Sequence, residues 1–193
     1  MKSNPYIHLQ ATYYGHYYIN MSNEFKYAVS LVIYRDPSNS SGKPTGASEV
    51  VVVQRPSTDK DLPNAWGLPA GMVTFDPTTT ATPTPDDFSK SAIIAGKAKM
   101  GLDVEIVRDM GTQSRDRGAY TLTMTQFEVR IIGKDGAVDS SALPVVPQPV
   151  EGITQYQQWR WGVAEELLPA AIVGSVCSRI YLKHATGYVP PNP

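Results

Sequence analysis

The sequence contains a single cysteine, Cys177, among its 193 residues. One cysteine cannot form a disulfide within the chain, and such a composition is typical of a reducing compartment. We therefore expect a cytoplasmic protein. Histidine is almost as scarce, and His8, His16 and His184 lie far apart along the chain. Because zinc sites use clustered cysteine and histidine ligands, this scatter argues against a zinc site.

Long apolar runs and a charge imbalance are also missing. No stretch reaches the roughly 20 apolar residues that a transmembrane helix needs. The N-terminus shows no charged segment followed by an apolar one, as a secretory signal would. The chain carries 17 basic and 18 acidic residues, so its net charge is −1 and provides no basic surface for nucleic acid. We expect neither a membrane nor a nucleic acid as a partner.

The length and the composition predict one domain with its own core, since 41% of the residues are hydrophobic. We assign this domain to residues 25–186, with a polar extension before it over 1–24 and a tail over 187–193. The extension contains a tyrosine cluster at 13–18, whose alternation favours an edge hairpin. Such a cluster can cover a pocket, form a homodimer interface or serve as a plain amphipathic edge strand.

Apolar periodicity predicts strands and helices in mixed order. We expect strands at 26–35, 49–56, 102–112, 119–133 and 153–162, and helices at 84–101, 163–173 and 175–185. Residues 64–75 form a turn-rich segment that enters a short strand, and a Thr/Pro-rich insertion follows at 76–85. This order of elements is typical of an α/β or α+β sandwich.

The helix at 84–101 has clear local signals at both ends. Thr84 is placed to cap it, Pro85 suits its first position and Asp87 suits the third, close to a capping box. Gly101 is a typical C-terminal stop. Five residues lie on one stripe, and all but the lysine are apolar: Phe88, Ala92, Ala95, Lys99 and Leu102.

Several ordered motifs resemble the Nudix hydrolase superfamily. Residues 51–73, VVVQRPSTDKDLPNAWGLPAGMV, resemble the entry to the family's Nudix box, G-x5-E-x7-R-E-U-x-E-E-x-G-U, where U is aliphatic. Gly71 fits the first glycine of that box, and Gly101 and Leu102 fit its closing pair. Residues 159–168, WRWGVAEELL, resemble the family's strand-to-helix element near the C-terminus. The resemblance covers about residues 27–183 and implies a Nudix-like α/β/α sandwich with a mixed β-sheet.

The metal-binding half of the box departs from the family pattern. Counting back from Gly101 places Asp86 at the first glutamate, Ile94 and Ala95 at the Arg-Glu pair, and Ala98 and Lys99 at the Glu-Glu pair. In the family these glutamates hold divalent cations that bridge a diphosphate and activate water. Positions 95, 98 and 99 share one helical face, which here carries two methyl groups and an ammonium. We expect no metal and no other cofactor.

Three residues are candidates for catalysis. Lys99 lies on the former metal face, where an ammonium can attract a phosphate or a carboxylate, although it can also extend along the helix to water. Asp86 matches a family glutamate, with helix capping as the alternative. Glu151 lies in the Pro-rich loop at 134–152, where the resemblance implies an acid that activates water.

Five residues are candidates for substrate binding. The resemblance places Arg55 at the end of the strand that enters the box, and Trp66 at the mouth of a pocket. Arg115, Arg117 and Tyr120 lie in the segment SRDRGAY, which we interpret as a turn. Arginine suits an oxyanion and tyrosine suits ring stacking, with a plain solvated turn as the alternative.

Three further acids are interpreted as structural. Glu128 belongs to the alternating strand at 119–133 and is expected to face solvent. Glu165 and Glu166 lie in the first turn of a helix, where negative charge is favourable.

The favoured function is that of a repurposed, metal-independent enzyme acting on a small organic or anionic substrate by acid–base catalysis, through hydrolysis, isomerisation or cyclisation. A protein that binds or senses a nucleotide or another small molecule without turnover is one alternative. A residual magnesium-dependent nucleoside-diphosphate hydrolase is another, with Asp86, Asp87 or Glu151 as substitute acids. In each case the partner is a small molecule.

Overall fold

The computed structural model describes residues 24–36, 47–147, 155–188 and 191. The expected N-terminal hairpin with its tyrosine cluster and the candidate Glu151 lie outside these residues. The division into an extension, a domain and a tail stays a prediction.

One four-stranded sheet, called sheet A, forms the centre of the molecule. Its strand order is β4 (Ala70–Met72), β1 (Glu24–Ile33), β6 (Tyr120–Ile131) and β5 (Val104–Asp116). The central strands β1 and β6 pair in parallel, whereas both edge strands pair antiparallel with their neighbours. The sheet is therefore mixed, as expected.

A smaller antiparallel sheet, called sheet B, continues from the end of β1. It has the order β3 (Trp66–Gly67), β2 (Val50–Gln54) and β7 (Gln158–Gly162). An isolated bridge between Tyr34 and Val50 links it to β1. The run of valines in β2 alternates between two hydrophobic cores, Val50 and Val52 in one and Val51 and Val53 in the other. This arrangement explains why the strand is apolar on both faces.

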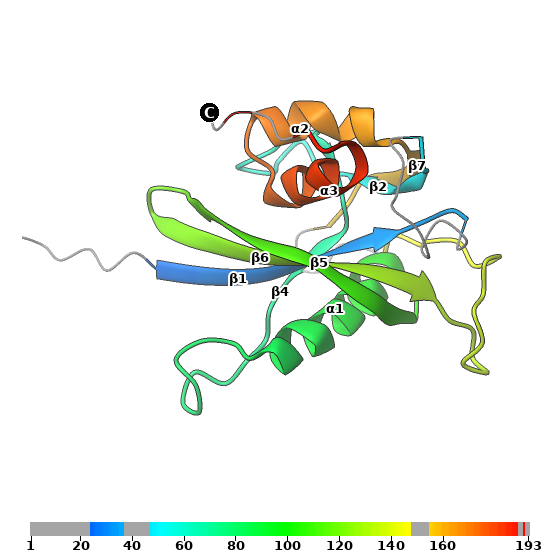
Figure 1. Cartoon of the computed structure of the whole chain (residues 1–193), viewed down its shortest axis with the longest axis horizontal. Coiled ribbons are helices and arrows are strands. Elements are labelled where there is room, and N and C mark those ends of the chain that lie inside the picture. The colour runs from blue at the N-terminus through cyan, green and yellow to red at the C-terminus, as the bar shows by residue number, and fades with distance from the viewer. Residues whose placement is uncertain (1–23, 37–46, 148–154, 189–190, 192–193) are drawn as a thin grey trace, which may run out of the picture.

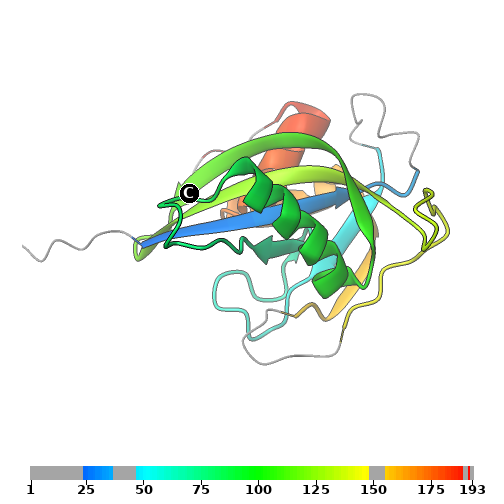
Figure 2. The same cartoon turned by 90° about the horizontal axis from the view of Figure 1, so that it is seen from below.

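Helices cover both faces of sheet A. Helix α1 (Pro85–Met100) lies on one face, while the 3₁₀ helix η2 (Ala164–Leu167) and helices α2 (Leu168–Ile172) and α3 (Val176–Thr186) lie on the other (Figure 1). Seen from below, α1 crosses the strands of sheet A (Figure 2). The chain is an α/β/α sandwich, which confirms the expected fold class.

The ends of α1 match the local signals in the sequence. The Thr84 side chain accepts a hydrogen bond from the Asp87 N–H, and the Asp87 carboxylate accepts one from the Thr84 N–H, which completes a capping box. Gly101 ends the helix in the left-handed region at φ 66°. Residues within one turn of each end therefore determine where the helix begins and where it ends.

Two elements and one residue differ clearly from the sequence-based expectation, and β7 is shorter than the strand expected at 153–162. Strand β5 runs on to Asp116, so residues 114–116 belong to the strand and the turn is shorter than expected. The segment 163–173 divides into η2 and α2, with Pro169 at the start of α2. Glu128 is completely buried, so the expectation that it faces solvent was wrong.

Within the described residues, none of the helices is long and apolar enough to cross a membrane.

Candidate functional site

The face of α1 that carries positions 95, 98 and 99 packs against β4 at Ala95. Ala95 is only 4% exposed, and a Cβ built on Gly71 in β4 would lie 3.0 Å from the Ala95 Cβ. Ala98 is exposed and Lys99 is half-buried. The small residues Gly71 and Ala95 thus let α1 approach β4 closely, and no space is left between them for a longer side chain.

This face does not fit a divalent cation. Magnesium and similar cations need several oxygen ligands, and this face provides methyl groups and an ammonium. Within the described ranges, no group of three or more His, Cys, Asp or Glu side chains could hold a metal ion. The chemistry of the side chains that are present is instead that of an anion site.

Lys99 has a second cation as its electrostatic neighbour. Burial lowers the pKa of the Lys99 ammonium, and the positive charge of Arg55 lowers it further. Arg55 directly follows β2 and donates from Nη1 to Asp59 Oδ2 at 2.8 Å. A half-buried lysine beside an arginine is an arrangement that attracts anions, and burial and the neighbouring charge both make the lysine easier to deprotonate.

Asp59 holds Arg55 in place. Its Oδ1 accepts hydrogen bonds from the N–H groups of Asp61 and Leu62, at 3.0 and 2.9 Å. Burial by itself would raise the pKa of Asp59, but the Leu62 N–H and the charge of Arg55 outweigh burial and lower it. Asp59 therefore stays ionised and acts as an anchor for the guanidinium.

Tyr156 is an electrostatic neighbour of Arg55. Its hydroxyl accepts a hydrogen bond from the Ala70 N–H at 2.8 Å and donates one to the Ala70 carbonyl at 3.2 Å. Burial raises the pKa of Tyr156 to about 12, although Arg55 acts to lower it. The phenol stays neutral and ties the chain before β7 to β4. We call the group of Arg55, Asp59, Lys99 and Tyr156 the basic corner.

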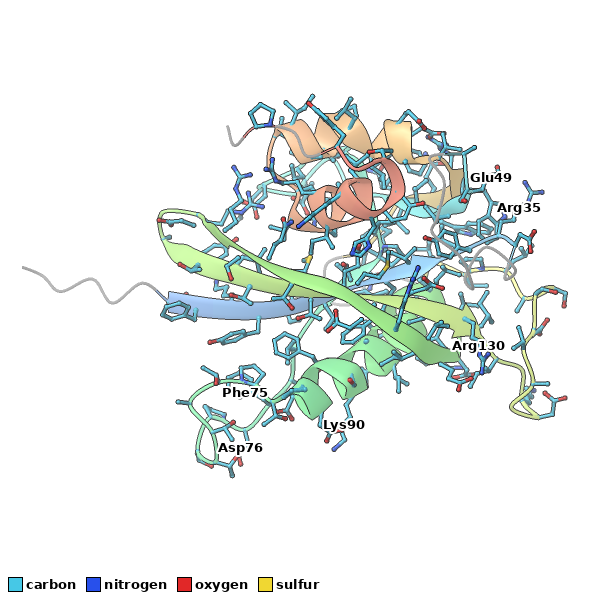
Figure 3. The ribbon with its side chains drawn as sticks, viewed as in Figure 1. Arg35, Glu49, Phe75, Asp76, Lys90 and Arg130 are labelled. Carbon is cyan, nitrogen blue, oxygen red and sulfur yellow. The ribbon has the colours of Figure 1, made fainter. Side chains whose placement is uncertain are left out.

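The other predicted catalytic residues do not join the basic corner. Asp86 lies 13 residues before Lys99 in α1, which is about 20 Å along the helix axis. Its carboxylate pairs with Lys90 at 2.7 Å, and Lys90 points away from the sheet (Figure 3). Asp87 is engaged in the capping box. Glu151 lies outside the described residues, so its role stays a prediction.

Two predicted aromatic residues already contact cations of the chain. The Arg160 guanidinium lies 4.4 Å from the centre of the Trp66 ring and pairs with Glu166. The Lys26 ammonium lies 4.4 Å from the centre of the Tyr120 ring at the start of β6. One face of each ring is therefore covered from within the chain.

Arg115 and Arg117 lie in a different part of the molecule from Lys99. Arg117 Nη2 donates to the Gly174 carbonyl at 3.0 Å, in the turn between α2 and α3. Lys99 belongs to α1, which covers the opposite face of sheet A (Figure 1). The predicted substrate-binding arginines thus divide into two groups, with only Arg55 at the basic corner.

Sequence reasoning missed a buried polar cluster around Glu128. The Glu128 side chain is 0% exposed, and its Oε2 accepts a hydrogen bond from Arg108 Nε at 2.8 Å and forms an ion pair with Arg108 Nη2 at 2.8 Å. Two register shifts in β5, on either side of Asp109, disrupt the ladder beside this pair. Tyr34 and Tyr181 act on each other and on Glu128 electrostatically. The local pattern gave no signal of this burial, because Gln126 and Arg130, the neighbours of Glu128 on the same face of β6, are also polar.

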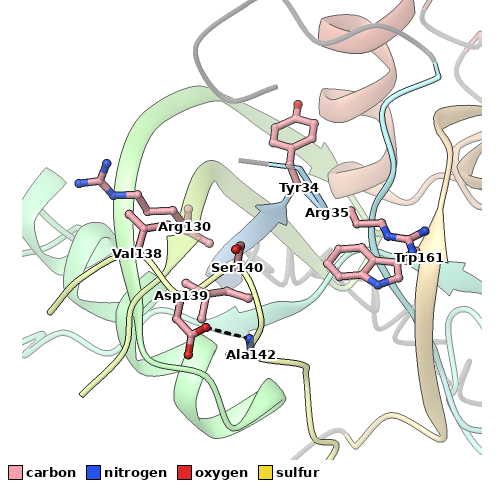
Figure 4. Close-up of a pocket in the computed structure, with 10 residues that line it drawn as sticks. Tyr34, Arg35, Arg130, Val138, Asp139, Ser140, Ala142 and Trp161 are labelled. Atoms are coloured by element: carbon pink, nitrogen blue, oxygen red, sulfur yellow. Dashed lines mark hydrogen bonds between the residues drawn. The ribbon is translucent and has the colours of Figure 1, made fainter. Parts of the chain in front are cut away.

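A separate hollow lies beyond the ends of β1 and β6. It is shallow, with a cavity volume of about 20 Å³, and Tyr34, Arg130 and Ser140 are among its lining residues. Figure 4 shows Arg35 and Trp161 together on one side. Both arginines are engaged, Arg35 with Glu49 and Arg130 with Glu105. Among the described residues, none of those predicted as catalytic or substrate-binding lines the hollow.

The sequence matches no protein-family model and no curated protein. Solved structures do match the fold. The NUDIX hydrolase from Nitrosomonas europaea aligns over 87% of this chain and 93% of its own, with 11% identity and a TM-score of 0.53. The NUDIX hydrolase from Alicyclobacillus acidocaldarius aligns over 89% of this chain and 100% of its own, with 14% identity and a TM-score of 0.50. The chain has the Nudix fold.

Proposed function

We propose that this Nudix-fold chain is a metal-independent enzyme that binds a small anionic substrate at the basic corner. One observation carries the proposal. Lys99 is half-buried beside Arg55 on the helix face where the Nudix box would place glutamates, and its pKa is lowered there by burial and by Arg55. The positive charge on this face repels magnesium. The same charge attracts a phosphate or a carboxylate, the kind of group that magnesium neutralises in the Nudix family.

The residues of the corner have distinct proposed roles. Arg55, anchored by Asp59, presents guanidinium donors in a fixed direction and binds the anionic group of the substrate. Lys99 contributes charge and, through its lowered pKa, transfers a proton during hydrolysis, isomerisation or cyclisation. The proposal names the class of substrate by its anionic group and leaves its organic part open.

Binding without turnover is the second candidate function. Asp59 favours it, because its two backbone hydrogen bonds and the Arg55 ion pair keep it an ionised acceptor. This leaves Lys99 as the group of the corner whose lowered pKa favours proton transfer, and many acid–base reactions need two such groups.

The proposal is tested by calorimetry and by product assays on a panel of nucleotides, sugar phosphates and small carboxylates, each with EDTA and with Mg²⁺. We expect binding or turnover in EDTA, weakened about tenfold or more by Lys99→Met through loss of a charged contact. Lys97→Met is the matched control, since Lys97 is exposed and pairs with Asp103. It should leave both measurements unchanged.

Three outcomes separate the candidate functions. Binding in EDTA without any product supports the second candidate. Turnover that requires Mg²⁺ or Mn²⁺ and falls in Asp86→Asn contradicts the proposal and supports a residual metal-dependent hydrolase. Equal binding by wild type and Lys99→Met removes the basic corner as the site.

A further inference from the structure

Three arginines from different elements converge on the turn between α2 and α3. Arg115 comes from the end of β5, Arg117 from the β5–β6 turn and Arg179 from α3. Arg117 Nη2 donates to the Gly174 carbonyl at 3.0 Å, and Arg179 Nη1 lies 3.5 Å from the Ala171 carbonyl. A Cβ on Gly174 would lie 1.9 Å from Arg115 Nη1. We call Arg115, Arg117 and Arg179 the arginine cluster.

The cluster is cationic and partly buried. Arg179 is 8% exposed, and Arg115 and Arg117 are half-buried. Within the described part of the chain, neither Arg115 nor Arg117 forms an ion pair. Burial lowers the pKa of Arg115, and the charges of Arg117 and Arg179 lower it further. Like charges held this closely repel, so the arrangement has an electrostatic cost by itself.

Two donors of the cluster point to a missing acceptor. Arg115 Nη1 and Arg117 Nε are buried and have no hydrogen-bond partner within the described residues. Buried N–H groups in proteins are almost always paired with a protein acceptor, a water or a ligand. The carbonyls of Ala171 and Gly174 accept from other atoms of the cluster and leave these two donors unsatisfied.

The start of α3 adds to the positive potential at the same turn. Its N-cap residue, Ser175, makes no capping hydrogen bond, because its hydroxyl interacts with Cys177 and Ser178 instead. The first N–H groups of a helix carry its positive dipole end and bind negative charge. Gly174, at φ 101°, is needed here for its backbone conformation and for the space that Arg115 occupies.

We propose that the arginine cluster is a second anion site, which binds a phosphoryl group of a small molecule. Guanidinium forks match phosphate oxygens, and a dianion offsets the repulsion among three cations better than a single carboxylate does. This site goes beyond the proposed function. The arginine cluster lies on the face of sheet A that α2 and α3 cover. Lys99 of the basic corner belongs to α1, which covers the opposite face (Figure 1).

The test uses the full chain with inorganic phosphate, measured by calorimetry and by thermal unfolding against chloride at equal ionic strength. We expect phosphate to raise the unfolding temperature of the wild type. In Arg115→Gln/Arg117→Gln, phosphate affinity falls about tenfold or more and this rise disappears. Arg130→Gln is the matched control, an exposed arginine that pairs with Glu105. It should keep the phosphate response.

The stability of the variants in phosphate-free buffer shows whether Arg115 binds phosphate or only supports the fold. The guanidinium of Arg115 makes no hydrogen bond within the described chain, so Arg115→Gln alone should fold and should be no less stable than the wild type in phosphate-free buffer. The single variant still loses most of the phosphate response. An unchanged phosphate response in either variant overturns the proposal. It is also overturned if phosphate and chloride stabilise the wild type equally.

Discussion

Glu128 has no exposed surface, and its two carboxylate oxygens have different surroundings. Oε2 accepts a hydrogen bond from Arg108 Nε and forms an ion pair with Arg108 Nη2, whereas Oε1 has no partner within the described residues. Gln126, two residues earlier on the same face of β6, also has a buried oxygen without a partner. Burial raises the pKa of Glu128 above its ordinary value of 4.5, and the Arg108 hydrogen bond and charge oppose that rise.

Glu128→Gln should remove a pH dependence of stability. Because the folded pKa is raised, folded Glu128 keeps its proton at pH values where the unfolded chain has lost it. The stability of the wild type relative to the variant is therefore highest below pH 4.5 and falls as pH rises through the folded pKa. The fall is at most about 1.4 kcal/mol per pH unit. Urea unfolding of both proteins between about pH 4 and about pH 8 measures it.

The control for this prediction is Glu105→Gln, which removes an exposed carboxylate paired with Arg130. Its stability relative to the wild type should change little across the same range, because exposed ion pairs contribute little. A wild-type minus Glu128→Gln difference that is constant with pH would show that Glu128 titrates alike in the folded and unfolded chains.

At the scale of elements, α1 packs by means of small residues. Gly96 lies so close to β5 that a Cβ on it would be 2.6 Å from a Val104 methyl group, and a Cβ on Gly71 would be 3.0 Å from the Ala95 Cβ. Close packing of this kind leaves little tolerance for added volume. The helix is thus held near the sheet on the side where a Nudix box would require a glutamate at position 95.

Ala95→Glu should destabilise the fold by about 2–5 kcal/mol, since it introduces both volume and an unpaired carboxylate into a buried contact. Ala98→Glu is the matched control on the same helix. Ala98 is exposed, so this variant should stay within about 0.5 kcal/mol of the wild type. Urea unfolding of both variants decides the comparison. Equal stability would mean that β4 leaves room for a metal-binding acid beside α1.

At the scale of the whole molecule, two hydrophobic cores share the same strands. One lies between sheet A and α2–α3, and the other between sheet A and α1. Strand β1 supplies Ala28 and Val32 to the first, and Leu31 and Ile33 to the second. Strand β2 divides its valines in the same way. Because neither core is complete without these strands, loss of one removes support from the other.

We therefore predict a single cooperative unfolding transition for the chain. Near-UV circular dichroism reports mainly Trp159 and Trp161 on the α1 side and Trp66 on the other, and far-UV circular dichroism reports the backbone. The two signals should change at the same urea concentration. The size of the chain argues for this test, because domains above about 150 residues often unfold through intermediates. Separate midpoints would show that the two layers are independent units.

The sequence was sufficient where the deciding interactions are local. The capping box of Thr84 and Asp87, the stop at Gly101 and the mixed order of strands and helices all follow from residues a few positions apart. The order of elements was enough for a sandwich of strands and helices, whereas the α/β/α arrangement was implied by the resemblance to the Nudix superfamily. The sequence also established that positions 95, 98 and 99 carry no carboxylate, because residue identity alone decides that.

Tertiary structure decided which side chains share an environment. Arg117 meets a carbonyl 57 residues away, Tyr156 meets Ala70 at a separation of 86, and Glu128 meets Arg108 at 20. Periodicity and capping rules act over a few residues and carry no information on such partners. For that reason the sequence grouped Arg115 and Arg117 with Arg55 and placed Glu128 in solvent. The physical cause is that burial and charge proximity depend on how distant segments pack, and only the folded chain fixes that packing.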